Sequence, residues 1–230
     1  MQHPNSEEIG LAAVDAVALD NIKDVGATLA DSILVPVLDH SLLESIPVVG
    51  IIFKMAKTGV AIRERLFIKK LGTFLLELQS VPAADREKFV KELNEDPIAK
   101  QKIGENLILL IDRLDDIQKA SMLGKFFGLY IIKRISHDIF RRYSIAVDRA
   151  YLPDLEALLS LTSISEITQI DLTEIQMQEL YMLGLASAPL GKEIEPIHKD
   201  YEELSGSKSS TTVWLTELGI YFRKFLSGDY

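Results

Sequence analysis

Histidine and carboxylate side chains are the residues of this sequence that could transfer protons or bind a metal ion. The chain has 4 histidines, and each lies in a different segment: His3, His40, His137 and His198. Only His40 has a carboxylate at helical spacing, Glu44, and one such pair supplies too few ligands for a metal site. We therefore expect these histidines to have surface or capping roles.

Three aspartates, Asp112, Asp115 and Asp116, form the densest carboxylate group. A catalytic Mg²⁺ site needs carboxylates that converge from several elements, whereas these lie at one expected helix end and turn. We expect Asp115 and Asp116 to stabilise the positive N-terminus of the next helix instead. The chain contains no cysteine, no glycine-rich phosphate-binding loop and no Gly-x-Ser-x-Gly turn. The sequence therefore predicts a protein that is not an enzyme, with no metal, no cofactor and no evident small-molecule ligand.

Two clusters of cations are the candidates for contact with an anionic partner. They belong to residues 61–150, which hold 17 basic and 13 acidic side chains, whereas residues 1–60 hold 3 and 8, and residues 151–230 hold 5 and 13. Cations at helical spacing suit carboxylates or phosphates, although such faces are often only solvated. The candidate contact residues are Arg63, Arg65, Lys69, Lys70, Lys133, Arg134, Arg141 and Arg142. We favour an acidic protein surface or an anionic lipid over duplex DNA as their partner.

Residues 33–62 contain the longest apolar run of the chain, residues 46–53, which Pro47 and Gly50 interrupt. Such a run covers about 12 Å as a helix, against a hydrocarbon core of ~30 Å, so it is too short to span a bilayer. Two interpretations stay open: a buried helical hairpin, which we favour, or a segment that is released to a membrane surface. The residues concerned are Ile46, Val48, Val49, Ile51, Ile52 and Phe53.

The composition is that of a globular protein. The 230 residues are 47% hydrophobic and 26% charged, which suits a compact core. Residues 1–8 lack the basic n-region of a secretory signal, and we therefore expect a cytoplasmic location. The net charge of −9 disfavours nonspecific binding to nucleic acids.

Apolar residues recur with helical periodicity through residues 1–150, and no strand pattern occurs there. Near the N-terminus they follow one stripe from Leu11 to Ile33, which predicts a single long amphipathic helix. Further helices with short connections are expected from residue 62 onward. The sequence therefore predicts a mainly α fold in which residues 1–150 form an antiparallel multi-helix domain.

Residues 151–230 predict a smaller α+β module of the winged-helix type. A helix that ends at Leu183-Gly184-Leu185 precedes two expected strands, Ala186–Pro189 and Thr211–Leu215, and a closing helix. The polar segment 204–210 between the strands predicts a flexible wing. No lysine or arginine occurs from residue 150 to 191, where a recognition helix would lie, and DNA binding needs such cations. We therefore expect no duplex DNA binding through this module.

A series of short motifs follows Leu107 along the chain. They are a helix through Met122 and Phe126, a helix through Phe140, Asp154-Leu155 with Leu158, and the closing segments Gly184-Leu185 and Leu215–Gly219 with Phe222. This order resembles the bacterial abortive infection alpha family over about half of the chain. The resemblance implies a helical body with a C-terminal winged-helix-like module and a role in phage resistance, and it implies no chemistry.

These observations favour a non-enzymatic protein-interaction component of a bacterial phage-defence or stress-response system. It would act through a protein partner or through self-association. Two alternatives stay open: a membrane-active effector, pore-forming or membrane-perturbing, that uses residues 33–62, and a winged-helix transcription regulator.

Overall fold

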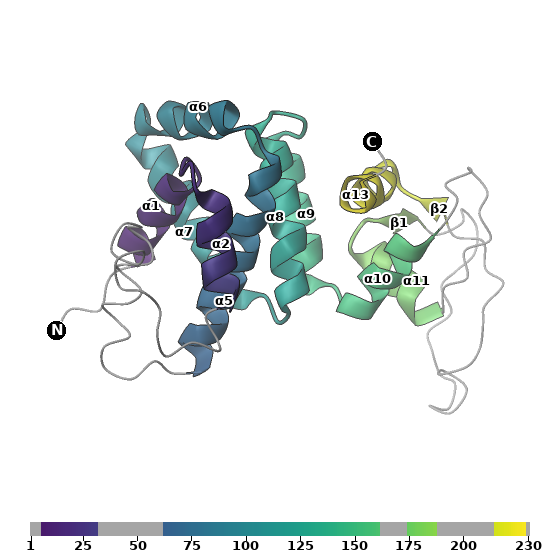
Figure 1. Ribbon diagram of the computed structural model, residues 1–230. Coiled ribbons are helices and arrows are strands. Elements are labelled where there is room, and N and C mark those ends of the chain that lie inside the picture. Colours follow the sequence, from purple (N-terminus) through teal and green to yellow (C-terminus); the bar gives the residue numbers. More distant parts are fainter. Residues whose placement is uncertain (1–5, 32–61, 162–173, 188–213, 229–230) are drawn as a thin grey trace. The chain divides into compact units, whose positions relative to one another are not determined.

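The structure, a computed structural model, describes residues 6–31, 62–161, 174–187 and 214–228. Helices dominate these residues, which confirms the prediction of a mainly α chain (Figure 1). The chain divides into two compact units, which we call unit 1, Met1–Ser144, and unit 2, Ile145–Tyr230. The division lies slightly before the boundary that the sequence placed after residue 150.

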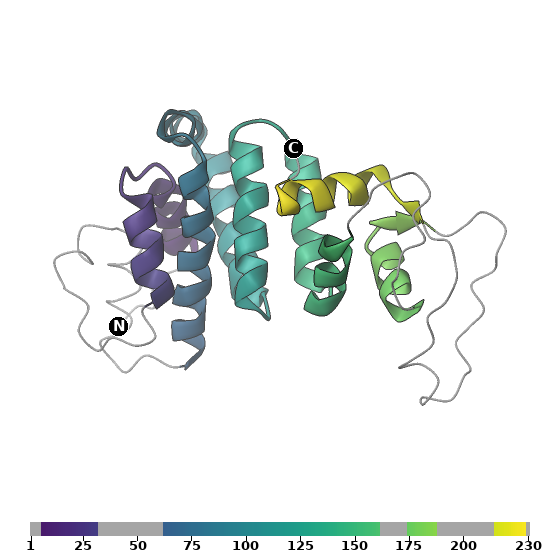
Figure 2. The same cartoon turned by 45° about the vertical axis from the view of Figure 1, so that its right-hand side comes forward.

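Unit 1 is a layered set of helices. Its elements are α1 (Ser6–Ala16), α2 (Ile22–Asp31), α5 (Ile62–Glu77), the short 3-10 helix η1 (Leu78–Ser80), α6 (Ala83–Asn94), α7 (Pro97–Arg113), α8 (Ile117–Ile131) and the first part of α9 (His137–Arg149). Figure 2 shows α5 between α2 and α8, and α5 contacts both helices. Helix α1 packs mainly on α7.

Glycines allow these helices to approach backbone to backbone. A Cβ on Gly10 of α1 would lie 2.7 Å from the carbonyl carbon of Gly104 on α7, and a Cβ on Gly104 would lie 2.5 Å from the Gly10 oxygen. Between α5 and α2, a Cβ on Gly72 would lie 2.5 Å from the backbone nitrogen of Ala30. Real Cβ atoms do not come this close, so these crossings require glycine.

The prediction of one continuous helix from Leu11 to Ile33 is wrong. Helix α1 ends at Ala16, and α2 begins at Ile22. The physical reason is tertiary: α1 packs on α7, whereas α2 packs on α5, and one straight helix cannot follow both partners. The apolar residues of both helices keep the helical period, but the two halves of the stripe face different helices.

Arg86 of α6 stabilises the turn between α1 and α2. Its buried guanidinium donates from Nη1 to the carbonyl oxygens of Val17 and Leu19, both at 2.7 Å, and from Nε to the carbonyl of Val81 at 3.2 Å. These carbonyls follow the end of α1, where helical partners are missing. Desolvation by burial lowers the pKa of Arg86, and the charge of Asp20 opposes that shift.

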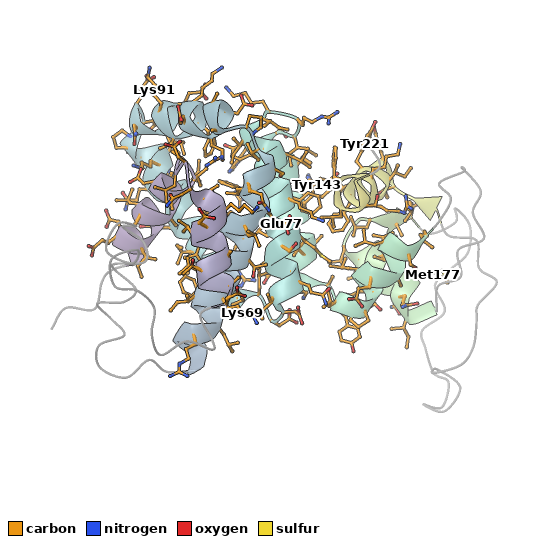
Figure 3. All side chains as sticks on the ribbon, in the orientation of Figure 1. Lys69, Glu77, Lys91, Tyr143, Met177 and Tyr221 are labelled. Carbon is orange, nitrogen blue, oxygen red and sulfur yellow. The ribbon has the colours of Figure 1, made fainter. Side chains whose placement is uncertain are left out.

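An aromatic cluster fills the centre of unit 1. Phe127 of α8 lies 5.4 Å from Phe74 of α5, 5.7 Å from Phe89 of α6 and 5.4 Å from Phe140 of α9, measured between ring centroids. Tyr143 of α9 is 1% exposed (Figure 3) and packs on Phe126 of α8, with 4.6 Å between ring centroids. Because each buried aromatic ring removes a large apolar area from water, this cluster joins four helices into one core.

Unit 2 contains the end of α9, α10 (Leu152–Ser160), α11 (Glu174–Met182), β1 (Ala186–Ser187), β2 (Trp214–Leu215) and α13 (Glu217–Ser227). The strands pair antiparallel, with Ala186 opposite Leu215 and Ser187 opposite Trp214. They form the one sheet found among the described residues, and both lie inside the segments for which strands were expected. The expected wing, residues 204–210, lies outside the described residues.

Backbone and capping hydrogen bonds connect the turn after α11 to the start of α13. Helix α11 ends at Met182, Gly184 then takes a left-handed φ of 72°, and the N–H of Leu185 donates to the carbonyl of Leu180 at 2.9 Å. Thr216 caps α13: its Oγ1 accepts from the N–H of Gly219 at 3.0 Å and donates to the carbonyl of Gly184 at 2.7 Å. The Leu-Gly-Leu and Leu-Thr-Glu-Leu-Gly motifs of the sequence are therefore joined to each other in space.

Candidate interaction site

The candidate cations on α5 do not form one surface. The prediction that Lys70 contacts an anionic partner is wrong. Its side chain is 7% exposed, and its Nζ donates to the carbonyl oxygens of Asp112 at 2.7 Å and Leu114 at 2.8 Å. These carbonyls lie at the C-terminal end of α7, where a cation is favourable. Neighbouring residues on a helix point about 100° apart, so Lys69 turns outward while Lys70 turns inward.

The other α5 candidates are more accessible. Arg65 is exposed and Lys69 is partly exposed; Figure 3 labels Lys69 on α5. Arg63 lies on α5 too, but its side chain is outside the described residues. Leu66, next to Arg65, is 44% exposed.

Lys133 and Arg134 form the turn after α8. Lys133 has a φ of 58°, in the left-handed region where glycine is usual, and its N–H and that of Arg134 donate to the carbonyls of Tyr130 and Leu129. Both side chains are exposed, and Lys133 Nζ lies 3.0 Å from Glu92 Oε2 on α6. Lys133 is therefore paired with a carboxylate of unit 1.

Arg141 and Arg142 are exposed on α9, opposite the face on which Phe140 and Tyr143 enter the core. Neither guanidinium has a hydrogen-bond or ion-pair partner among the described residues. Of the eight candidate cations, these two best match the expected role of an anion contact.

Other cations of unit 1 form ion pairs within the protein. Lys100 of α7 pairs with Asp15 of α1 at 2.6 Å, and Lys119, which is fully buried on α8, pairs with Asp115 at 2.6 Å. Asp116 accepts from the N–H of Gln118 at 2.7 Å as the N-cap of α8. The interpretation of Asp115 and Asp116 as groups at a helix N-terminus is thus confirmed.

Helix α11 carries apolar side chains on its exposed side. Ile175 is 47% exposed, Tyr181 43% and Met182 74%, while Met177 and Leu180 are buried in unit 2. Ile175 and Met182 are seven residues apart and therefore lie on the same face, with Gln178 and Glu179 between them. We call Ile175, Gln178, Glu179 and Met182 the α11 face.

Exposed apolar residues are concentrated in unit 2. Of the ten large hydrophobic residues that are exposed among the described residues, six lie in unit 2: Ile145, Tyr151, Ile175, Tyr181, Met182 and Tyr221. The α11 face was not predicted from the sequence. The available signal was that apolar residues occur all around this helix, which leaves some of them outside a one-sided core.

Polar contacts position α11 and α13 within unit 2. Asp154, 6% exposed in the first turn of α10, accepts a side-chain hydrogen bond from Gln176 of α11, and desolvation by burial raises its pKa while that bond opposes the shift. Arg223 of α13 is buried and donates to the carbonyl oxygen of Leu161. The helices that flank the α11 face are thereby tied together by buried polar groups.

The candidate segment from Ile46 to Phe53 lies outside the described residues. None of the helices that the structure does describe has the length and apolar character needed to cross a membrane. In the same residues, no three or more His, Asp or Glu side chains gather as a possible metal site.

Comparisons with known proteins give no further identification. No family model, no curated protein and no solved structure matches the chain.

Proposed function

We propose that this chain is a non-enzymatic protein-interaction component of a bacterial phage-defence or stress-response system that acts in the cytoplasm. Unit 2 is its docking module, winged-helix-like in that its described elements follow the order helix, helix, strand, strand, helix. The observation that supports the proposal best is the α11 face, which exposes Ile175 and Met182 where the recognition helix of a DNA-binding winged helix would expose cations.

The chemistry of this face favours a protein partner. Methionine and tyrosine are enriched where proteins bind each other, and Met182 and Tyr181 are both exposed on α11. Glu179 adds a negative charge, and no lysine or arginine occurs between residues 150 and 191. Phosphate backbones would be repelled by this surface, whereas a protein with an apolar pocket and a cationic rim would fit it.

The test compares substitutions on two helices. The chain is expressed with its chromosomal neighbours in a phage-sensitive host, and plaque formation is measured for wild type and for Ile175→Glu/Met182→Glu. Protection should be lost in this double variant, because a buried carboxylate at the docking surface has no partner. The proteins that co-purify with wild type are then purified, and their affinity for each variant is measured by calorimetry, with an expected loss of about tenfold or more.

A matched control makes the same chemical change elsewhere. Ile98 and Leu109 of α7 are 67% and 55% exposed, so Ile98→Glu/Leu109→Glu also places two carboxylates at exposed apolar positions. This variant should protect as wild type does. Undiminished protection and partner binding by the α11 variant would contradict the proposal, and salt-sensitive duplex DNA binding that the α11 variant loses would favour a transcription regulator instead.

A further inference from the structure

Helix α9 presents a second surface, which we call the arginine face: Arg141, Arg142, Ile145 and Arg149. All four side chains are exposed, and Ile145 is 43% exposed. Arg142, Ile145 and Arg149 stand three, four and seven residues apart and therefore lie on one side of the helix, and Arg141, four residues before Ile145, lies at the edge of that side. Arg141 and Arg149 are separated by about 12 Å at ~1.5 Å of rise per residue.

The three guanidinium groups have no hydrogen-bond or ion-pair partner in the part of the chain that the structure describes. Lys70, Arg86 and Lys100, by contrast, each bind a carbonyl or carboxylate of the same chain. A guanidinium binds a carboxylate through two parallel hydrogen bonds, and three of them around one isoleucine suit a partner that offers both acids and apolar side chains.

The chain itself has such a surface in the α11 face. Ile175 and Met182 supply apolar contacts, and Glu179 is an acid without a partner among the described residues. Gln178 is exposed beside Glu179, and its amide oxygen can accept a hydrogen bond from a guanidinium. The two faces are thus opposite in charge, and both include exposed apolar side chains.

We infer that the protein self-associates, with the arginine face of one copy bound to the α11 face of a second copy. In a two-fold dimer the contact occurs twice, because each copy contributes both faces. A second copy fits better than a nucleic acid or a lipid surface, since Ile145 at the centre of the arginines requires an apolar contact and the face carries no aromatic ring on which a base could stack. This inference rests on the proposed function and names a second copy of the chain as the protein that the α11 face binds.

Sedimentation velocity of the full chain over a range of concentrations and salt tests this inference by charge exchange. Wild type should form dimers that salt weakens. Arg141→Glu/Arg142→Glu and Glu179→Arg should each dissociate about tenfold or more readily, because like charges then face each other. Mixing these two variants should restore the dimer, since glutamates then meet arginine in one contact and arginines meet Glu179 in the other.

Lys88→Glu/Lys91→Glu on α6 is the control, since it changes the net charge as much as the α9 double variant does. Both lysines are exposed, and Figure 3 shows Lys91 projecting outward from α6. This variant should dimerise as wild type does. A wild type that stays monomeric at low salt, or variants that do not recover on mixing, would overturn the inference.

The outcomes separate this inference from the proposed function. A monomeric wild type whose protection is still abolished by Ile175→Glu/Met182→Glu would leave the proposed function standing and refute self-association. Binding of a monomeric chain to anionic vesicles or to DNA that Arg141→Glu/Arg142→Glu abolishes would assign the arginine face to that polyanion and would also refute self-association.

Discussion

Gly219→Ala should destabilise unit 2 by about 3 kcal/mol without destabilising unit 1. Gly219 lies in the first turn of α13, directly against the turn after α11. A Cβ at this position would stand 1.9 Å from the carbonyl oxygen of Leu185 and 2.8 Å from its carbonyl carbon. Both are backbone atoms, so no side-chain rotation can relieve the clash.

The magnitude follows from what must move. The α13 backbone has to retreat by about 1 Å to reach an acceptable contact, and overpacking of this kind costs ~1–3 kcal/mol. The retreat also breaks the bond from the Thr216 N–H to the carbonyl of Leu185, 3.0 Å long, and strains the Thr216 cap, at about 1 kcal/mol each. Alanine recovers ~1 kcal/mol through its higher helix propensity, so we expect a net loss of about 3 kcal/mol in the free energy of unfolding.

The chain provides its own reporter for the assay. Trp214, the only tryptophan among the 230 residues, lies on β2 in unit 2. Urea unfolding of the full chain, followed by tryptophan fluorescence and by far-UV circular dichroism, therefore distinguishes unit 2 from the whole protein. The variant should lower the midpoint seen by fluorescence and leave the main dichroism transition of unit 1 near its wild-type position.

Gly228→Ala, at the other end of α13, is the matched control. Gly228 has a φ of 81°, and in the part of the chain that the structure describes no neighbouring atom lies within 4 Å of its ideal Cβ, so we expect only the left-handed backbone penalty of ~1 kcal/mol. A Gly219→Ala protein with the fluorescence midpoint of wild type, or one no less stable than Gly228→Ala, would refute the reasoning.

Three further results are expected from the described contacts. Lys70→Met should destabilise unit 1 by about 2 kcal/mol in denaturant unfolding, because two carbonyls lose their donor. The control Lys69→Met should change the stability of unit 1 by less than about 0.5 kcal/mol, and equal effects of the two substitutions would contradict the assigned roles. Gly104→Ala should cost about 2 kcal/mol or more by the same measurement, since its Cβ would meet the Gly10 backbone, and a tolerated alanine would show that α1 and α7 can separate cheaply. The raised pKa of Asp154 means that folding favours its protonated form. Wild type should therefore lose stability relative to Asp154→Asn as the pH rises through and above the ordinary carboxyl pKa, and should regain that stability at lower pH. A difference in unfolding midpoint, followed by Trp214 fluorescence, that does not depend on pH would contradict this.

Local pattern in the sequence was enough for the class of fold. Apolar residues with helical periodicity indicate helices because one stripe must be buried, and this holds whichever helices later cover it. The two strands were found in the expected segments for the same local reason. The absence of cations from residue 150 to 191 is likewise a property of the sequence, and it can be read without the geometry of α11.

Tertiary contacts decided the properties that depend on which elements meet. The stripe from Leu11 to Ile33 is continuous in the sequence, but α7 and α5 each take one half of it, so the helix breaks between Ala16 and Ile22. Lys69 and Lys70 cannot be distinguished by residue type. The position of the carbonyls at the end of α7 makes Lys70 a structural residue and leaves Lys69 nearer the surface. In the sequence Gly219 is an ordinary helical glycine, but in the structure the contact of α13 with Leu185 requires glycine at this position. The reason is that the helix propensity of a residue belongs to the sequence, whereas the space beside its Cα depends on which segment packs against it.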